Sequence, residues 1–298
     1  MSEFTLLDRQ QLDTLLERAQ ERLFSYGVGF VKVGATPGAE PILAGSGTLV
    51  VIAGVYGILT ADHVLENLPR TGRVGLMFGR YPQGPVHRFT IAMDVASRLI
   101  IAKASGNESG PDLGFLALPP DAVSALKARA SFYEVVSRRT RMLSSPPAIE
   151  SGGWIILGVV DEWSIFGPGE SGFKGVKHFT TVCGGSAVSH EEQRDGFDYL
   201  YFEVKCSDPE QNRPTSFKGT SGGSLWQLVA QLGPEGVSIK EALLSGVAFY
   251  QSEIRDGGRT IVCHGRRSIY ERVVNAVLGD RAEQAVPRDA AERHARER

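Results

Sequence analysis

Residues 41–61 read PILAGSGTLVVIAGVYGILTA and contain no charged side chain. About twenty apolar residues are enough for a helix that crosses a bilayer, so a membrane span has to be considered first. The stretch, however, holds four glycines, is rich in β-branched residues and is broken at Ala53-Gly54. This pattern is typical of two buried strands joined by a tight turn. We therefore predict two strands here and no membrane partner.

Short apolar runs broken by Gly, Pro, Asn and Asp continue on both sides of this stretch, from Val28 to about Phe249. They include GVGFVKVG, RVGLMF, FTIAMDV, LGFLAL, WIILGVV, YLYFEV and LLSGVAFY. Glycine accounts for 35 of the 298 residues, which also indicates many turns. Closely spaced short strands with only brief helical stretches between them predict an all-β fold, either a barrel or a sandwich.

Helical spacing is found mainly at the two ends of the chain. Apolar residues between 6 and 24 recur at the spacing of one helix face, and Ser268 with Glu271 forms a capping box before a helix that ends at Gly279. The stretch from Ser137 to Gly153 indicates a linker between two β units. We predict an N-terminal helix in residues 1–25, a first β unit in 26–140, a second β unit with the final helix in 141–280, and a disordered charged tail in 281–298.

The overall composition excludes several classes of protein. The formal net charge of −2 gives no electrostatic reason to expect nucleic acid as a partner. Three cysteines cannot form a disulfide-dense scaffold, and the mixed charges of the first residues do not resemble a secretory signal. We therefore expect a cytoplasmic protein with free thiols at Cys183, Cys206 and Cys263. No standard metal-ligand spacing is found, so we expect neither a metal nor a cofactor.

The segment SFKGTSGGSLW, residues 216–226, carries the strongest chemical signal. Glycines on both sides of Ser221 allow a tight turn, and such a turn can present the serine Oγ and aim backbone N–H groups at one point. An ordinary glycine-rich turn between two strands is an equally good interpretation of this segment alone. A serine hydroxyl is almost wholly protonated at neutral pH, so a nucleophilic role needs a base from elsewhere in the chain.

Two further segments supply candidate partners for this serine. His63 lies in YGILTADHVLE, where a buried strand ends and a short helical turn begins, and Asp112 lies in GPDLGFLALP just before another apolar strand. Each has a structural interpretation of its own, as a strand-end histidine and as a turn acid after Pro111. Their joint occurrence with Ser221, in the order His, Asp, Ser, favours nucleophilic catalysis by a triad.

The segments GSGTLV, ILTADHV, PDLGFLAL and GTSGGSL resemble, in this order, landmark segments of the trypsin-like (chymotrypsin-fold) serine proteases. The resemblance covers roughly residues 26–279. It implies a double six-stranded antiparallel β-barrel with N- and C-terminal helices. It also implies a serine endopeptidase with His63, Asp112 and Ser221 as catalytic residues, and an oxyanion hole formed by the backbone N–H groups of Gly219 and Ser221.

The same resemblance implies where a protein or peptide substrate would lie. Ala248, Phe249 and Tyr250 would run along an extended substrate, and Thr215 would lie at the base of the pocket for the residue before the cut. A neutral hydroxyl at that base predicts a preference for small or medium uncharged residues. Thr220 stands where many secreted members carry an Asp that receives a newly cut N-terminal amine. The chain therefore resembles the bacterial, HtrA-like branch, without the PDZ domain that often follows.

Other functions stay open at this point. A catalytically silent protease fold that binds peptides or serves as a scaffold would keep the same segments, because the presence of a triad does not prove its geometry. An α/β-hydrolase would also satisfy G-x-S-x-G around Ser221, with His264 as the candidate base, but needs long helices between its strands. For the protease, a regulatory protein that binds the N-terminal helix is a further hypothesis, since an active cytoplasmic protease needs control.

Overall fold

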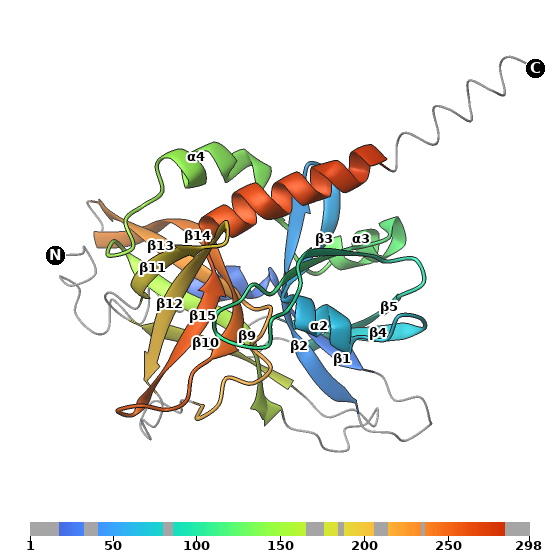
Figure 1. Ribbon diagram of the computed structural model, residues 1–298, viewed down its shortest axis with the longest axis horizontal. Coiled ribbons are helices and arrows are strands. Elements are labelled where there is room, and N and C mark those ends of the chain that lie inside the picture. Colours follow the sequence, from blue (N-terminus) through green and yellow to red (C-terminus); the bar gives the residue numbers. More distant parts are fainter. Residues whose placement is uncertain are drawn as a thin grey trace, which may run out of the picture.

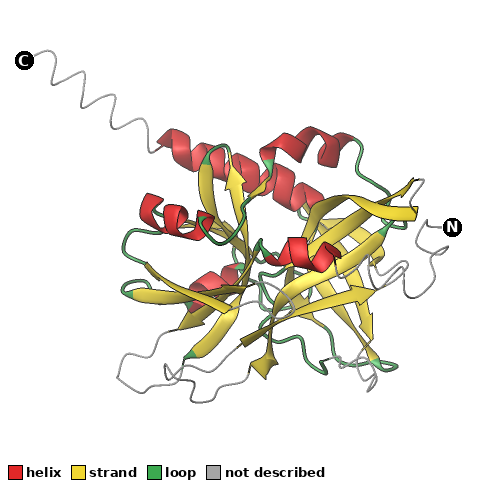
Figure 2. Ribbon diagram, turned by 180° about the vertical axis from the view of Figure 1, so that it is seen from behind, coloured by secondary structure: helices red, strands yellow, loops and turns green. Residues whose placement is uncertain are grey.

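The computed structural model describes residues 18–32, 41–79, 86–164, 176–183, 188–205, 214–233 and 236–283 of the chain. Within these residues most of the secondary structure is β, arranged as two sheets that lie side by side (Figure 1). Helices lie on the outside of the sheets and along their common upper edge (Figure 2). The prediction of an all-β fold is confirmed. The α/β-hydrolase alternative does not fit, because the long strands pair antiparallel.

The first sheet contains eight strands, which come from the part of the chain between Gly27 and Glu134. They are β1 (Gly27–Lys32), β2 (Ile42–Ile52), β3 (Val55–Thr60), β4 (Arg73–Gly79), β5 (Val86–Ala92), β6 (Ser97–Ala102), β7 (Leu113–Ala117) and β8 (Tyr133–Glu134). Their order in space is β5-β4-β1-β2-β3-β7-β6, with β8 beside β2. The two strands predicted in residues 41–61 are β2 and β3, which turn at Ala53 and Gly54, both with positive φ.

The second sheet contains seven strands. They are β9 (Gly153–Ser164), β10 (Val176–Cys183), β11 (Val188–Arg194), β12 (Phe197–Lys205), β13 (Ser224–Gly233), β14 (Gly236–Gln251) and β15 (Gly258–His264). Their order in space is β10-β9-β13-β14-β15-β12-β11. The segment between the two sheets, predicted as a linker, contains the short helix α4 (Arg139–Ser144).

The sheets differ from the predicted pair of six-stranded barrels in their number of strands and in their closure. They hold eight and seven strands, and among the described residues the end strands of each sheet do not pair with one another. The first sheet gains a strand because β8, only two residues long, adds to β2 by a parallel pairing at Val50 and Val51. Each hydrogen-bonded path therefore has two free ends, and neither barrel is closed.

One apolar core joins the two sheets. The ring of Tyr26 stacks on the indole of Trp226 with centroids 5.4 Å apart, and Tyr133 meets the same indole edge-on at 5.1 Å. The final helix begins at residue 266, contains a π-helical turn at Ser268–Val273, and packs Ile269 into this core. Burial of such large side chains is the dominant stabilising contribution in folding, so the two sheets and the final helix stabilise one another.

The terminal helices are described only in part. Residues 18–24 are helical with Leu23 and Phe24 buried, whereas the rest of the predicted N-terminal helix and residues 284–298 lie outside the described residues. The final helix does not end at the predicted Gly279 but continues to residue 283. Its last turn is held in place by Arg281, whose guanidinium donates to the carbonyl of Ala53 at 2.6 Å.

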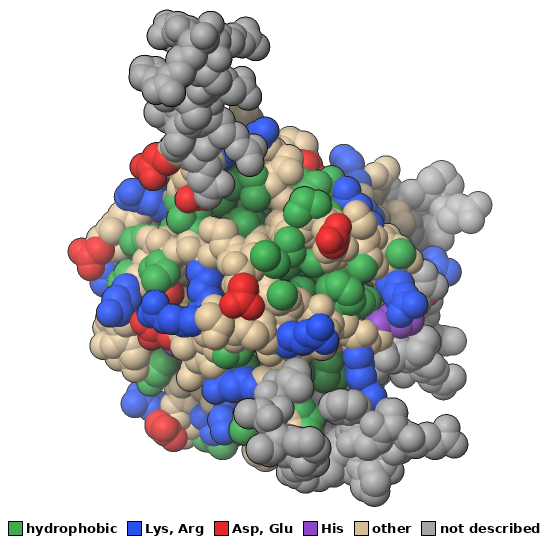
Figure 3. All heavy atoms as spheres, turned by 90° about the vertical axis from the view of Figure 1, so that its right-hand side faces the viewer, with side chains coloured by type: hydrophobic (Ala, Val, Ile, Leu, Met, Phe, Trp, Pro, Cys, Tyr) green, Lys and Arg blue, Asp and Glu red, His purple; other side chains and the backbone are tan. Residues whose placement is uncertain are grey.

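None of the helices in the described residues is long and apolar enough to cross a bilayer. On the face shown in Figure 3, Lys and Arg side chains are interspersed with Asp, Glu and apolar side chains.

The two remaining α-helices of the described residues are α2 (Asp62–Asn67), beside the carboxyl end of β3, and α3 (Pro120–Lys127).

Candidate active site

The turn that precedes β13 carries Ser221, and only glycine fits at two of its positions. Gly219 has φ +92 and Gly222 has φ +83, both in the left-handed region that other residues avoid. A Cβ on Gly219 would lie 2.7 Å from the carbonyl oxygen of Val159, and one on Gly222 would lie 2.1 Å from that of Ser46. The glycines noted in the sequence therefore allow this turn to pack against strands of both sheets.

Every carbonyl group from residue 218 to residue 221 accepts a hydrogen bond from the protein. The donors, in that order, are Asp161 N–H (2.8 Å), Ser46 Oγ (2.7 Å), Gly223 N–H (2.7 Å) and Ser46 N–H (2.7 Å). The C=O and N–H of a trans peptide point in opposite directions. The N–H of Gly219 therefore points away from Asp161, and the N–H of Ser221 points away from Gly223.

These two N–H groups are the predicted oxyanion donors. Around them, the N–H groups of Thr220, Gly222 and Gly223 all donate to carbonyl oxygens of the protein. For Gly219 and Ser221 no backbone or side-chain acceptor is found among the described residues. The turn thus keeps two neighbouring donors available for a ligand, the arrangement needed to bind a developing oxyanion.

Ser46, on β2, holds this turn to both sheets. Its side chain, 1% exposed, donates from Oγ to the carbonyl of Gly219 and accepts the N–H of Val159 on β9 at 2.8 Å. Its own carbonyl accepts the hydroxyl of Thr60, at the end of β3, at 2.7 Å. Sequence reasoning did not identify Ser46, because a serine inside GSGTLV has no local signal for these contacts.

His63 lies in the first turn of α2, directly after β3, and is oriented by one carboxylate. Asp112 Oδ1 accepts the backbone N–H of His63 at 3.0 Å, and Asp112 Oδ2 lies 2.5 Å from the ring Nδ1. An ionised carboxylate can only accept, so it places the ring proton on Nδ1 and leaves Nε2 as the acceptor. The Asp112 side chain is 6% exposed and that of His63 is 33% exposed. The ring thus has one buried, oriented side and one accessible side.

His264, at the end of β15, lies beneath this pair. Its Nε2 accepts the backbone N–H of Asp112 at 2.9 Å, and its ring packs against the ring of Phe249 with centroids 4.8 Å apart. Burial lowers the pKa of His264 to about 3, so the ring is neutral at neutral pH and keeps Nε2 as an acceptor. The sequence offered His264 only as the base of a hydrolase, but the structure places it behind Asp112.

A second buried carboxyl lies next to His63. Asp62 is fully buried, and its Oδ2 accepts the backbone N–H of Ala104 at 2.9 Å, whereas its Oδ1 has no hydrogen-bond partner among the described residues. Burial raises the pKa of Asp62, and the nearby charges of Glu66 and Asp112 act in the same direction. The carboxyl group therefore helps to join α2 to the chain after β6.

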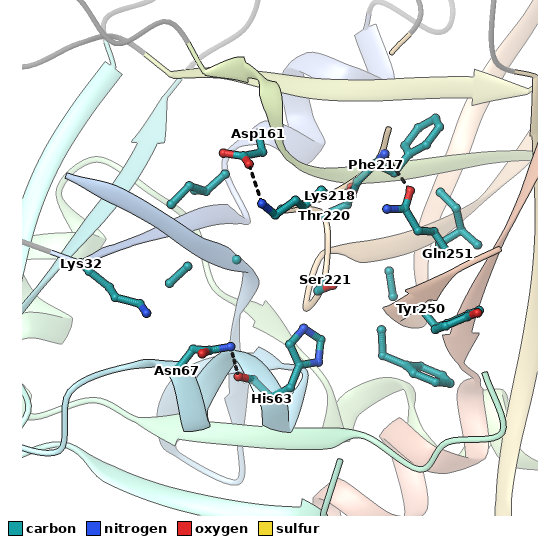
Figure 4. Close-up of a pocket in the computed structure, with 17 residues that line it drawn as sticks. Lys32, His63, Asn67, Asp161, Phe217, Lys218, Thr220, Ser221, Tyr250 and Gln251 are labelled. Carbon is teal, nitrogen blue, oxygen red and sulfur yellow. Dashed lines mark hydrogen bonds and ion pairs between the residues drawn. The ribbon is translucent and has the colours of Figure 1, made fainter. Parts of the chain in front are cut away.

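Ser221 and His63 line one cavity of about 550 Å³. Figure 4 shows Ser221 beside the His63 ring, at the centre of this cavity. The structure shows no hydrogen bond between these two described residues, and such bonds are often long before a substrate is bound. Ser221 and His63 thus face a single cavity, and Asp112 contacts His63 without lining that cavity itself.

The predicted substrate residues fall into two groups. Ala248, Phe249 and Tyr250, at the end of β14, line the cavity. Ala248 cannot pair with a substrate backbone, because its N–H donates to Gly223 and its carbonyl accepts the N–H of Gly222. An edge for an extended ligand therefore begins at Phe249, beyond Val247, where the pairing of β14 with β13 ends.

Thr215 does not line the cavity, in contrast to the prediction. Its hydroxyl donates to Glu162 at 2.9 Å, and the same carboxylate accepts the N–H groups of Thr215 and Ser216. This carboxylate therefore binds both the side chain and the backbone of the loop that carries Thr215. Phe217, Gln251 and Ile261 line that end instead, with the Gln251 amide oxygen accepting the N–H of Phe217 at 2.9 Å.

Metal binding is not indicated in the part of the chain that the structure describes. There, no three His, Cys, Asp or Glu side chains lie close enough together to hold an ion. Of the three cysteines, Cys263 is a buried free thiol, and burial raises its pKa. The side chains of Cys183 and Cys206 lie outside the described residues.

Comparisons with known proteins add little to this geometry. No protein-family model matches the chain, and no curated protein matches it. A solved structure from a study of the coupled folding and binding of the intrinsically disordered Sesbania mosaic virus VPg protein matches 83% of this chain and 88% of its own, at 15% identity and a TM-score of 0.40. A similarity at this level carries no argument, so the site has to be interpreted from its own contacts.

Proposed function

We propose that the protein is a serine endopeptidase, similar to the trypsin-like (chymotrypsin-fold) proteases and, among these, to the HtrA-like bacterial branch. One observation carries the proposal: one cavity is lined by Ser221, by His63, which Asp112 orients, and by Gly219, and the N–H groups of Gly219 and Ser221 have no acceptor among the described residues. Each of these groups, taken alone, can be explained by a role in the fold without any catalysis. Their convergence is what acyl transfer requires, namely a nucleophile, an oriented base and donors for the oxyanion.

The reaction would proceed in two halves. Ser221 Oγ attacks the carbonyl carbon of the peptide bond while His63 Nε2 takes its proton, and the N–H groups of Gly219 and Ser221 bind the oxyanion. The C–N bond breaks as His63 gives that proton to the leaving amine. Water then attacks the acyl-enzyme ester, with His63 taking a proton from the water and returning it to Ser221 Oγ. Asp112 orients the imidazole and stabilises its cationic form.

A fluorophosphonate probe tests the proposal directly, because its phosphorus forms a bond to an activated serine oxygen and releases fluoride. We expect the wild-type protein to be labelled and Ser221→Ala not to be labelled. Labelling of His63→Ala should be slower by several orders of magnitude, because the base and the nucleophile act as a unit. Ser131→Ala, which removes an exposed hydroxyl outside this cavity, is the matched control and should label normally. Labelling that survives Ser221→Ala would refute the assignment of the nucleophile.

A catalytically silent peptide-binding module is the second candidate. It is favoured by the missing hydrogen bond between Ser221 and His63 in the described structure. Such a module would bind extended peptides at the edge that starts at Phe249, but would not react with the probe. Peptide binding without labelling would therefore support the module, whereas labelling that depends on both residues would support the endopeptidase.

A further inference from the structure

Two lysines line the cavity that holds Ser221, and their surroundings differ. The ammonium of Lys218 forms an ion pair with Asp161, with 3.3 Å between Nζ and Oδ2. Lys32, the last residue of β1, is half-buried and has no ion-pair partner among the described residues. Asp161 is the one carboxylate in the described lining and is already paired with Lys218, so Lys32 is the one ammonium of this lining that has no carboxylate beside it.

This charge lies at one end of the cavity. In Figure 4 Lys32 and Tyr250 are on opposite sides of Ser221, and Lys32 extends toward Asn67. The amide of Asn67 donates to the carbonyl of His63 at 2.9 Å, which fixes its position beside the base. The cavity therefore has a polar, cationic end at Lys32 and a more apolar end at Tyr250.

A protein with a formal net charge of −2 has no general attraction for acidic peptides. A preference for them would have to arise from a local group, and a half-buried ammonium is less screened by solvent than an exposed one. We propose that Lys32 forms a subsite for a carboxylate, so that the preferred substrates are peptides with Asp or Glu on the side of the cleaved bond that lies away from Tyr250. The choice of side rests on the proposed function, in which the acyl half of the peptide substrate lies along Phe249 and Tyr250. The carboxylate of the substrate therefore belongs to the other half, which leaves as the amine.

The experiment measures peptide binding in a Ser221→Ala background, where no cleavage can occur. Fluorescently labelled peptides of uncharged residues carry Glu or Gln at one position, moved stepwise along the peptide. We expect Glu at one position of the leaving half to bind about threefold to tenfold more tightly than Gln. Adding Lys32→Gln should abolish this difference, whereas Lys32→Arg should retain it. Lys240→Gln, which removes the same charge outside the cavity, should leave it unchanged.

The result separates this inference from the proposed function. If the wild-type protein is not labelled by the probe but the Glu preference depends on Lys32, the carboxylate subsite stands and the endopeptidase does not. Equal binding of Glu and Gln peptides, or a Glu preference that persists in Lys32→Gln, would overturn the subsite. Failure of all peptides to bind would overturn it as well.

Discussion

Replacing Ser46 by alanine should slow the reaction of Ser221 even under conditions where the variant is fully folded. The hydroxyl is fully enclosed, donates to the carbonyl of Gly219 at 2.7 Å and accepts the N–H of Val159 at 2.8 Å. Alanine leaves the buried N–H of Val159 without a partner, which costs about 1–3 kcal/mol of stability. It also releases the peptide that follows Gly219, between the two oxyanion donors.

The expected loss of rate follows from the contribution that a single oxyanion donor makes to the reaction rate. Removing a single oxyanion donor typically lowers the rate by about 10²–10³-fold, so a donor that is displaced but retained should cost about 10–100-fold. Labelling by the fluorophosphonate probe gives the rate, and urea unfolding gives the stability. Ser245→Ala is a matched control, because Ser245 is equally buried but its hydroxyl bonds only to Leu243, two residues earlier on the same strand.

The two measurements decide between a positioning role and a merely structural one. Ser46→Ala should lose rate at a protein concentration and temperature where it is fully folded, and Ser245→Ala should lose stability alone. Equal labelling rates for Ser46→Ala and the wild-type protein would refute the reasoning, whatever the change in stability.

Three other variants test neighbouring contacts. Asp112→Asn should lower the labelling rate by about 10⁴-fold, because an amide can stabilise the wrong tautomer of the base, and a loss under tenfold would contradict this role. The pKa of His264 is about 3 in the folded protein and about 6.5 in the unfolded chain, so between these pH values only the unfolded state binds a proton at this ring. The free energy of unfolding should therefore fall by up to about 1.4 kcal/mol per pH unit as the pH decreases from 6.5 toward 3. Urea unfolding from pH 7 to 4.5 should show a flatter pH dependence for His264→Gln than for the wild-type protein, and an unchanged slope would refute this. Gly219→Ala should lower labelling at least about 100-fold, because its Cβ would lie 2.7 Å from the Val159 carbonyl, whereas Gly257→Ala, with φ +74 but open space around it, should label normally.

The sequence was sufficient to predict the all-β class and to select the three residues of the proposed triad. Strand periodicity is local, and so is the turn chemistry around Ser221, so both can be read from neighbouring residues. The contacts that hold the site are not local. Ser46 meets Gly219 across 173 positions and His264 meets Asp112 across 152, and no periodic pattern encodes such pairs.

The positions of substrate residues were harder to predict, for a related reason. The resemblance implied that Thr215 lies at the base of the substrate pocket, but its hydroxyl and N–H are bound by Glu162, a carboxylate of β9 that is 53 positions away. Similarly, the number of strands and their closure depend on pairings at the ends of each sheet. A two-residue strand such as β8 has no recognisable pattern, because its length is below any period that could be detected.

The contacts of Ser46 and His264 have a consequence for when the site can exist during synthesis. A chain made from its N-terminus has His63 and Asp112 long before it has Ser221, and Ser221 before His264. The carboxylate that orients the proposed base therefore lacks the support of His264 until β15 has joined the second sheet, after Ser221 has already been made. If Ser221 is the nucleophile, as proposed, a nascent chain would acquire reactivity only after β15 has been made and has joined the second sheet.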